Sequence, residues 1–327
     1  MKNNDTRHIP MALAHSLKFP DMPCGQFSGH ETFPLRQLWL PKIAHAVDSA
    51  RTLGFSPDFT SESGIEHAIL SLGIGKNMVS SARFWARASG IITESDELTE
   101  IGKLIFGEGY KSGKDPYCAN PATVWLVHWN LASTPDHFTP IWFLFNQVNQ
   151  PTLDRQTFVD GMKELCRING WNVSDNTLRR AQECTLRAYL PRLSAKGYVE
   201  DFVEPLLAEL NLLETTASRD VFMIRRGAHK TLPHEIFVYA LMNFWISKFP
   251  QSSSLDFSRI AHDYGSPGRV FKLDNDSIAE RLQKIVDITN GCLEWTEQAG
   301  LRQVIRRKKA HSNPEEFAFD MLVKAYT

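Results

Sequence analysis

The chain has few cysteines, and none of them is spaced as a structural metal site requires. Its 327 residues include Cys24, Cys118, Cys166, Cys184 and Cys292, which form no C-x-x-C pair. An odd number of scattered cysteines in a chain of this length argues against a disulfide framework and against a structural zinc site. This cysteine usage is typical of a reducing compartment, so we expect a cytoplasmic protein.

Long apolar runs are also missing. The longest, Ile236–Ile246, is interrupted by Asn243 and is too short to cross a bilayer, so we expect a buried helix there. The first residues, Met1–Pro10, are polar and lack the apolar core of a signal peptide. The sequence therefore predicts no membrane partner.

Motifs of common enzyme classes are absent as well. The chain contains no Walker loop, G-x-G-x-x-G, H-E-x-x-H or G-x-S-x-G pattern. The net charge is −1, so the surface as a whole does not attract a polyanion. Any binding of nucleic acid must then come from local basic patches.

One such patch lies on a predicted helix that follows the Gly73–Gly75 turn. Its polar face carries Lys76, Ser80, Arg83 and Arg87 at positions i, i+4, i+7 and i+11. Asn77 stands at the helix start, where asparagine caps a helix or reaches a base edge. No acidic residue occurs between Ile69 and Thr93, as a helix close to phosphates requires. An ordinary amphipathic helix with a solvated basic face remains the alternative.

The segments around this helix follow the order of a winged helix-turn-helix. A helix at Ile65–Leu72 precedes the turn, and a β-hairpin is predicted at Ile91–Thr99, followed by a helix that Thr99 caps. We therefore predict a winged-helix DNA-binding domain over residues 1–149, with residues 1–23 as an irregular arm. Winged folds also dock proteins, so DNA contact is favoured and protein docking stays open.

Residues 150–327 are predicted to form a helical domain whose end, about 254–311, repeats the winged pattern. Helices at Leu255–Tyr264 and Ser277–Ile288 precede a hairpin made of Cys292–Thr296 and Leu301–Ile305. The predicted fold class is thus mainly α with small β-hairpins. The basic run that ends this hairpin is predicted to contact phosphate, and it contains Arg306, Arg307 and Lys308.

Candidate catalytic residues lie in two other segments. His30, Glu31 and Arg36 sit in or beside a turn at the start of a predicted helix, and Asp115 precedes Pro116. In metal-dependent strand cleavage, Glu31 and Asp115 could bind Mg²⁺ or Mn²⁺, His30 or His128 could act as the base, and Arg36 could stabilise the transition state. The alternatives are a helix cap with a local ion pair, a turn at Asp115 and a core histidine at position 128.

Three ordered blocks carry a resemblance to a known family, namely Gly29–Arg36, Leu72–Val79 and Asp115–Trp129, with looser similarity at Ser266–Leu273. They resemble the SspB-like family of uncharacterised-domain proteins, encoded beside the sulfur-transfer genes of bacterial DNA phosphorothioation systems. The chain departs from the family at Gln37–Leu38, where a small or aromatic residue is expected before Trp39. It also departs at Cys118–Asn120, where relatives tend to be acidic.

The resemblance implies a role in DNA modification and antiviral defence. The chain would nick one strand of double-stranded DNA so that sulfur can replace a non-bridging phosphate oxygen. Its partners would be a cysteine desulfurase, an ATP-using sulfur transferase and an ATPase, and a homodimer is compatible with this role. Two alternatives remain open, a non-catalytic winged-helix adaptor that recruits the sulfur-transfer enzymes and a module that only docks proteins.

Overall fold

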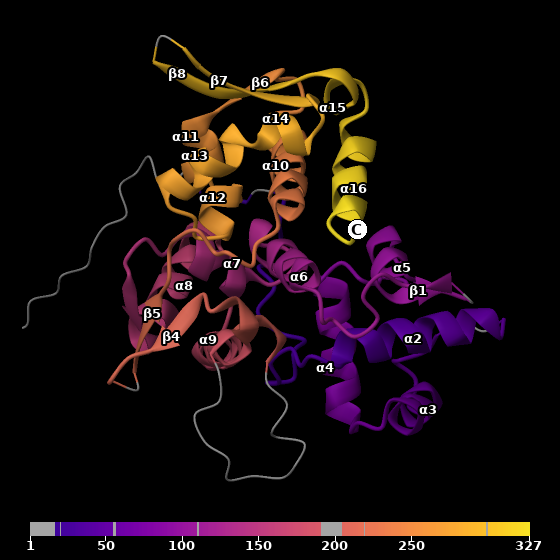
Figure 1. Cartoon of the computed structure of the whole chain (residues 1–327). Helices are drawn as coiled ribbons and strands as arrows, with labels where there is room; N and C mark the ends of the chain where they lie inside the picture. Colours follow the sequence, from indigo (N-terminus) through magenta and orange to yellow (C-terminus); the bar gives the residue numbers. More distant parts are fainter. Residues whose placement is uncertain are drawn as a thin grey trace, which may run out of the picture.

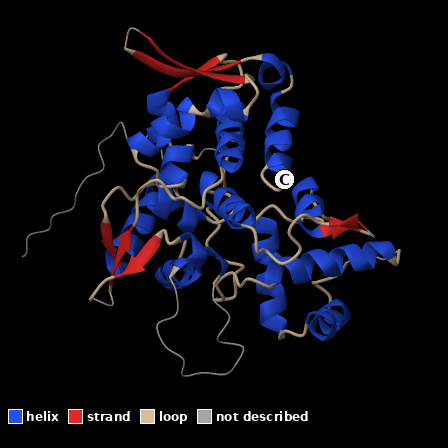
Figure 2. Cartoon of the chain, in the orientation of Figure 1, coloured by secondary structure: helices blue, strands red, loops and turns tan. Residues whose placement is uncertain are grey.

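The computed structural model describes residues 17–19, 21–54, 57–109, 111–190, 205–218, 220–298 and 300–327. Figure 1 shows a mainly helical chain, and Figure 2 shows its short strands gathered in small separate sheets. The predicted fold class, mainly α with small β-hairpins, is confirmed. Most of the predicted N-terminal arm lies outside the described residues.

The first helices form the predicted helix-turn-helix order. They are α2 (Trp39–Thr52), α3 (Glu62–Leu72) and α4 (Lys76–Ala88). The α3 helix begins where the Ser61 hydroxyl accepts the Gly64 N–H, and it ends at Gly73 in the left-handed conformation, so both ends carry a cap. The α4 helix buries Val79, Ala82 and Ala86, as its apolar spacing predicts.

The hairpin predicted at Ile91–Thr99 is present in minimal form, as one antiparallel bridge between Ile92 and Leu98 flanked by backbone hydrogen bonds from Thr99 to Ile91 and from Thr93 to Glu97. The polar tip between them curls back toward α4, with Asp96 in the left-handed conformation at φ 60°. Thr99 does cap the next helix by accepting the Gly102 N–H. That helix, α5 (Glu100–Phe106), leads into the short strands β1 (Gly107–Glu108) and β2 (Lys111–Ser112).

Two helices apolar almost all round run through the centre, namely α6 (Pro121–Ser133) and α7 (Thr139–Asn146). One continuous cluster of buried side chains extends from Leu17 to Leu322 and so crosses the predicted domain boundary near residue 150. His128 is fully buried in α6, and its ring nitrogens lie 2.7 Å from the Tyr189 hydroxyl and 2.8 Å from the Val270 carbonyl oxygen. It is a core histidine, so its proposed role as a base is wrong.

The middle of the chain contains a three-stranded sheet that the sequence did not reveal. Its elements are β3 (Thr152–Asp154), α8 (Arg155–Asn169), α9 (Asp175–Tyr189), η2 (Leu206–Leu210), β4 (Leu213–Thr215) and β5 (Val221–Ile224). The third strand in sequence lies between the other two, giving the order β3-β5-β4. The described helices between the first strand and the hairpin that pairs back with it are α8, α9 and the short η2.

The last part of the chain contains another three-stranded sheet with the same strand order. Its elements are α10 (His234–Lys248), β6 (Ser254–Asp256), α11 (Phe257–His262), α12 (Pro267–Val270), α13 (Asn275–Gln283), α14 (Ile285–Ile288), β7 (Leu293–Gln298), β8 (Leu301–Arg306), α15 (Lys308–Ser312) and α16 (Pro314–Lys324). The sheet order is again first, third, second, as β6-β8-β7. The hairpin of β7 and β8 is confirmed, whereas Leu255 belongs to a strand and not to the predicted helix. No helix within the described ranges is long and apolar enough to cross a membrane.

Candidate nucleic-acid interface

A strained loop at residues 29–33 lies between α4 and α9 (Figure 1). Gly29, Glu31 and Thr32 all have positive φ angles, of 100°, 46° and 63°. Only glycine fits at position 29, because a Cβ there would lie 2.7 Å from the Phe84 ring. Left-handed conformations at two consecutive non-glycine residues cost roughly 1–3 kcal/mol each and persist only where the surroundings enforce them.

Side chains from both helices enforce this conformation by binding the loop carbonyl groups. From α4, the Ser81 hydroxyl donates to the His30 carbonyl at 2.9 Å, and the Trp85 indole donates to the Phe33 carbonyl at 2.9 Å. From α9, the Cys184 thiol donates to the same Phe33 carbonyl at 3.3 Å. The loop is therefore fixed through its backbone, and the Glu31 side chain is left exposed.

Glu31 lines a polar groove of about 480 Å³ beside α4. The groove contains side chains of both charges together with a histidine. Its lining is Gln26, Gly29, Glu31, Phe59, Ser80, Arg83, Phe84, Arg87, Ala88, Glu94, Asp136 and His137. Three of the residues predicted to bind DNA thus share one groove with one predicted catalytic residue.

Two of these DNA-binding candidates are held by carboxylates that the local sequence pattern did not reveal. Arg83 donates to both oxygens of Asp96, with nitrogen–oxygen distances of 2.7–3.0 Å, and Arg87 lies 3.1 Å from Asp96 and 3.1 Å from Glu94. Asp96 itself is only 5% exposed. The absence of acidic residues along the helix therefore does not leave its basic face unpaired, because the following turn brings two carboxylates back to it.

The start of α4 is more open. Lys76 and Asn77 are exposed, while Ser80 is half-buried and its hydroxyl donates to the Lys76 carbonyl. Asn77 does not cap the helix, because Gly75 occupies the N-cap position without a side-chain hydrogen bond. The side chain of Asn77 is thus not used at the helix terminus.

Two predicted catalytic residues are buried instead of lying in the groove. His30 is 3% exposed, and desolvation lowers its pKa to about 4, against which hydrogen bonds with the backbone of Phe27 and His30 act. Its Nδ1 accepts the Thr32 N–H at 3.0 Å. Arg36 is also buried, with its guanidinium near the rings of Phe33 and Trp39. Both residues support the loop and are poorly placed to contact a substrate.

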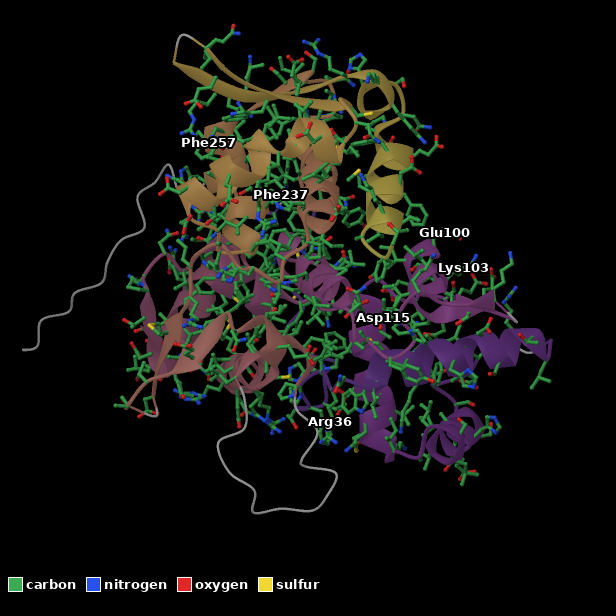
Figure 3. The ribbon with its side chains drawn as sticks, viewed as in Figure 1. Arg36, Glu100, Lys103, Asp115, Phe237 and Phe257 are labelled. Atoms are coloured by element: carbon green, nitrogen blue, oxygen red, sulfur yellow. The ribbon has the colours of Figure 1, made fainter. Side chains whose placement is uncertain are left out.

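Asp115 has a structural role, as its alternative interpretation as a turn residue predicts. Its carboxylate accepts the Ala119 N–H at 2.8 Å, the Asn120 N–H at 3.0 Å and the Thr123 hydroxyl at 2.6 Å. It does not line the groove that Glu31 lines, and Figure 3 shows it apart from Arg36. The prediction of Asp115 as a metal ligand beside Glu31 therefore finds no geometric support.

The basic run of the C-terminal hairpin is also less available than its sequence indicates. Arg306 is 6% exposed, packs over the Trp245 ring and donates to the carbonyls of Pro250 and Ser252. It points inward because side chains alternate along β8. Arg307 and Lys308 do lie at the surface, where Arg307 pairs with Glu294 at 3.1 Å and Lys308 donates to the Asn290 carbonyl.

A divalent metal was predicted, with no ligands assigned beyond Glu31 and Asp115. Across the described ranges, no group of three or more His, Cys, Asp or Glu side chains is placed to hold a metal ion.

The structure also adds residues that the sequence reasoning missed. Asp136 and His137 line the groove, Asp96 orders the α4 arginines, and Arg187 donates to the Thr32 carbonyl at 3.3 Å. All of them are separated in sequence from the residues they contact, so local sequence spacing does not predict these contacts.

Comparison with known proteins places this geometry in a family. No curated protein matches the chain significantly. Two solved structures share its fold, a crystal structure of SspB and a magnesium ion-bound crystal structure of SspB, each with a TM-score of 0.78. Each is 24% identical in sequence, over 92% of this chain and 88% of the other. A family model described as a protein of unknown function, DUF4007, matches residues 27–326. The chain therefore belongs to the DUF4007 family.

Proposed function

We propose that this protein binds duplex DNA and nicks one strand as part of a DNA phosphorothioation and anti-phage defence system. The observation that carries the proposal is the exposed Glu31 on a strained loop, in a groove that the basic face of α4 also lines. The SspB fold supports the same system. The sulfur-transfer and ATPase proteins of that system are the proposed partners.

Binding is proposed to use α4 as the recognition helix of a winged helix-turn-helix. In such modules the second helix of the pair enters the major groove, and its N-terminal residues contact the bases. Here those positions hold Lys76, Asn77 and Ser80, of which the first two are exposed. The N-terminus of a helix also attracts phosphate through its unpaired N–H groups.

Nicking is proposed to use the Glu31 carboxylate. It would take a proton from a water molecule whose oxygen forms a bond to phosphorus, while the bond to one backbone oxygen breaks. Arg83 and Arg87 line the same groove, where they would stabilise the charge that develops on the phosphate. The magnesium of the second SspB structure belongs to that protein, and no step here is assigned to a metal.

A non-catalytic DNA adaptor is the second candidate function. It is favoured by the structural role of Asp115, whose oxygens hold three donors, and by the burial of His30. The adaptor would bind duplex DNA through α4 and recruit the sulfur-transfer enzymes without cutting.

A plasmid assay separates the two functions. Supercoiled plasmid is incubated with the full chain, with and without its partner proteins, in Mg²⁺ or Mn²⁺. We expect open-circle product from the wild type and from Glu66→Gln, a control on an exposed glutamate of α3, but not from Glu31→Gln. Binding without any open-circle product would refute nicking and support the adaptor.

A binding assay tests the interface. Lys76→Gln with Asn77→Ala removes two exposed side chains and leaves the Asp96 network intact. We expect weaker duplex binding and a log–log salt slope reduced by about 0.9 for the lost lysine–phosphate contact. Unchanged affinity would show that α4 is not the DNA-contacting helix.

A further inference from the structure

We infer that α9 is a second DNA-contacting helix, which places Arg179 and Arg180 on the duplex backbone on the opposite side of the Glu31 loop from α4. The inference rests on the proposed DNA-binding function and adds a second contact surface to it. The ligand is the phosphate backbone of double-stranded DNA. Four features of the described residues support it, namely the exposed face of α9, its charge, its place in the topology and its contact with the loop.

The exposed face of α9 is narrow and basic. At 100° per residue, Asn176, Arg179, Arg180, Glu183 and Arg187 fall within an arc of about 100°. All five are exposed. Leu178, Ala181 and Leu186 are in the core, while Asp175 in the first turn is exposed and pairs with Lys163 of α8. The narrow face itself thus presents three arginines, one asparagine and one glutamate.

These arginines are not neutralised as those of α4 are. Within the described parts of the chain, no carboxylate lies within ion-pair distance of Arg179 or Arg180. By contrast, Arg167 on the neighbouring α8 pairs with Glu164 at 2.6 Å. Two unpaired guanidinium groups on one face are what a polyphosphate backbone binds well, because arginine forms strong bidentate contacts with phosphate.

The topology gives α9 the place of a recognition helix. Among the described α-helices between β3 and β4, it is the second. In helix-turn-helix proteins that second helix is the one that meets DNA. The strand order recurs in β6-β8-β7, but there α13 carries Asp276 and Glu280 and α14 carries Asp287, which repel phosphate.

The α9 face adjoins the loop that carries Glu31. Arg187, on that face, donates to the Thr32 carbonyl, and Cys184 donates to the Phe33 carbonyl. On the other side, Ser81 and Trp85 of α4 bind the same loop. A duplex whose backbone reaches Glu31 therefore lies between α4 and α9. Contacts from both helices would fix which phosphate of the strand lies at the loop.

The test compares charge-matched variants of the full chain by fluorescence anisotropy on a labelled duplex over a range of salt. Arg179→Gln with Arg180→Gln removes the two unpaired arginines. Lys111→Gln with Lys248→Gln removes two exposed lysines on β2 and α10, so it changes the net charge equally away from the proposed surface. Arg187 is left intact because it holds the loop. Thermal melting verifies that each variant is folded.

We expect the arginine variant to bind roughly ten- to sixty-fold more weakly at 0.1 M salt, with a log–log salt slope reduced by about 1.8. The lysine control should stay within about twofold of the wild type. Glu183→Gln should bind more tightly than the wild type, because it removes the one carboxylate of the face. Equal affinities of the arginine variant and the lysine control for the duplex would overturn the inference. This holds even if the arginine variant no longer binds a protein partner.

This result is distinguishable from failure of the proposed function. If the wild type shows no salt-dependent duplex binding, both the proposed function and the α9 surface are wrong. If the wild type binds and the Lys76 and Asn77 variant binds more weakly, while the arginine variant behaves as its control, only the α9 surface is wrong.

Discussion

Asp96→Asn is expected to destabilise the protein and to strengthen its binding to DNA at the same time. Asp96 is 5% exposed and accepts three hydrogen bonds from Arg83 and one from Arg87 through its two charged oxygens. Asparagine keeps the side-chain size and tolerates the φ of 60°, so the turn should survive. What is lost is the charge and one acceptor oxygen. Hydrogen bonds to charged groups contribute about 1.5–3 kcal/mol net, so we expect the free energy of unfolding to fall by about 2 kcal/mol.

Urea denaturation measures the loss, and Glu94→Gln is the matched control. Glu94 also pairs with Arg87, but its side chain is 89% exposed, and such surface pairs contribute about 1 kcal/mol or less. In the DNA-binding assay, Asp96→Asn should raise affinity roughly three- to tenfold at 0.1 M salt, because a released arginine can make a phosphate contact. If the free energy of unfolding changed no more than in Glu94→Gln, Asp96 would not hold α4 as described. A fall in affinity would show that Asp96 is needed to orient Arg83 and Arg87 toward DNA.

Three further predictions concern the loop and the core. Gly29→Ala should reduce the free energy of unfolding by about 1–3 kcal/mol, because the new Cβ would clash with Phe84 at a φ of 100°. Thermal melting should show a larger loss than for the control Gly54→Ala, whose site has open space. The free energy of unfolding should fall by about 2 kcal/mol through His30 as the pH drops from 6.5 to 5, because the pKa of this histidine is near 6.5 in the unfolded chain and about 4 in the folded one. In denaturation at both pH values, His30→Asn should show a smaller difference. Asp115→Asn should lower stability by about 1–3 kcal/mol while plasmid nicking per folded molecule stays unchanged, and a selective loss of nicking would return Asp115 to the active site.

The elements that local pattern determines were the ones predictable from sequence. The apolar spacing of Val79, Ala82 and Ala86 and the cap at Thr99 each depend on a few neighbouring residues. The hairpin of β7 and β8 was predictable for the same reason. The sheet of β3, β5 and β4 was not, because its strands are three or four residues long and its first strand pairs with one almost 70 positions later.

The site was predictable only in part. The segment around Glu31 was selected from sequence as a candidate site, and the structure adds its positive φ angles, which the sequence did not predict. The partners of its side chains were not predictable, because pairs such as Arg83 with Asp96 depend on how the chain folds back after α4. Arg306 shows the same limit, since a basic run gives no sign of which member turns inward beside Trp245.

The contacts that hold the loop at residues 29–33 in place do not involve the side chain of Glu31. Every hydrogen bond that α4 and α9 make to it ends on a main-chain oxygen, which each amino acid supplies equally. The side chain at position 31 is thus not needed to keep the two helices together. A substitution at position 31 by a residue that tolerates the φ of 46° should therefore change the surface chemistry at little cost to the packing of the two helices.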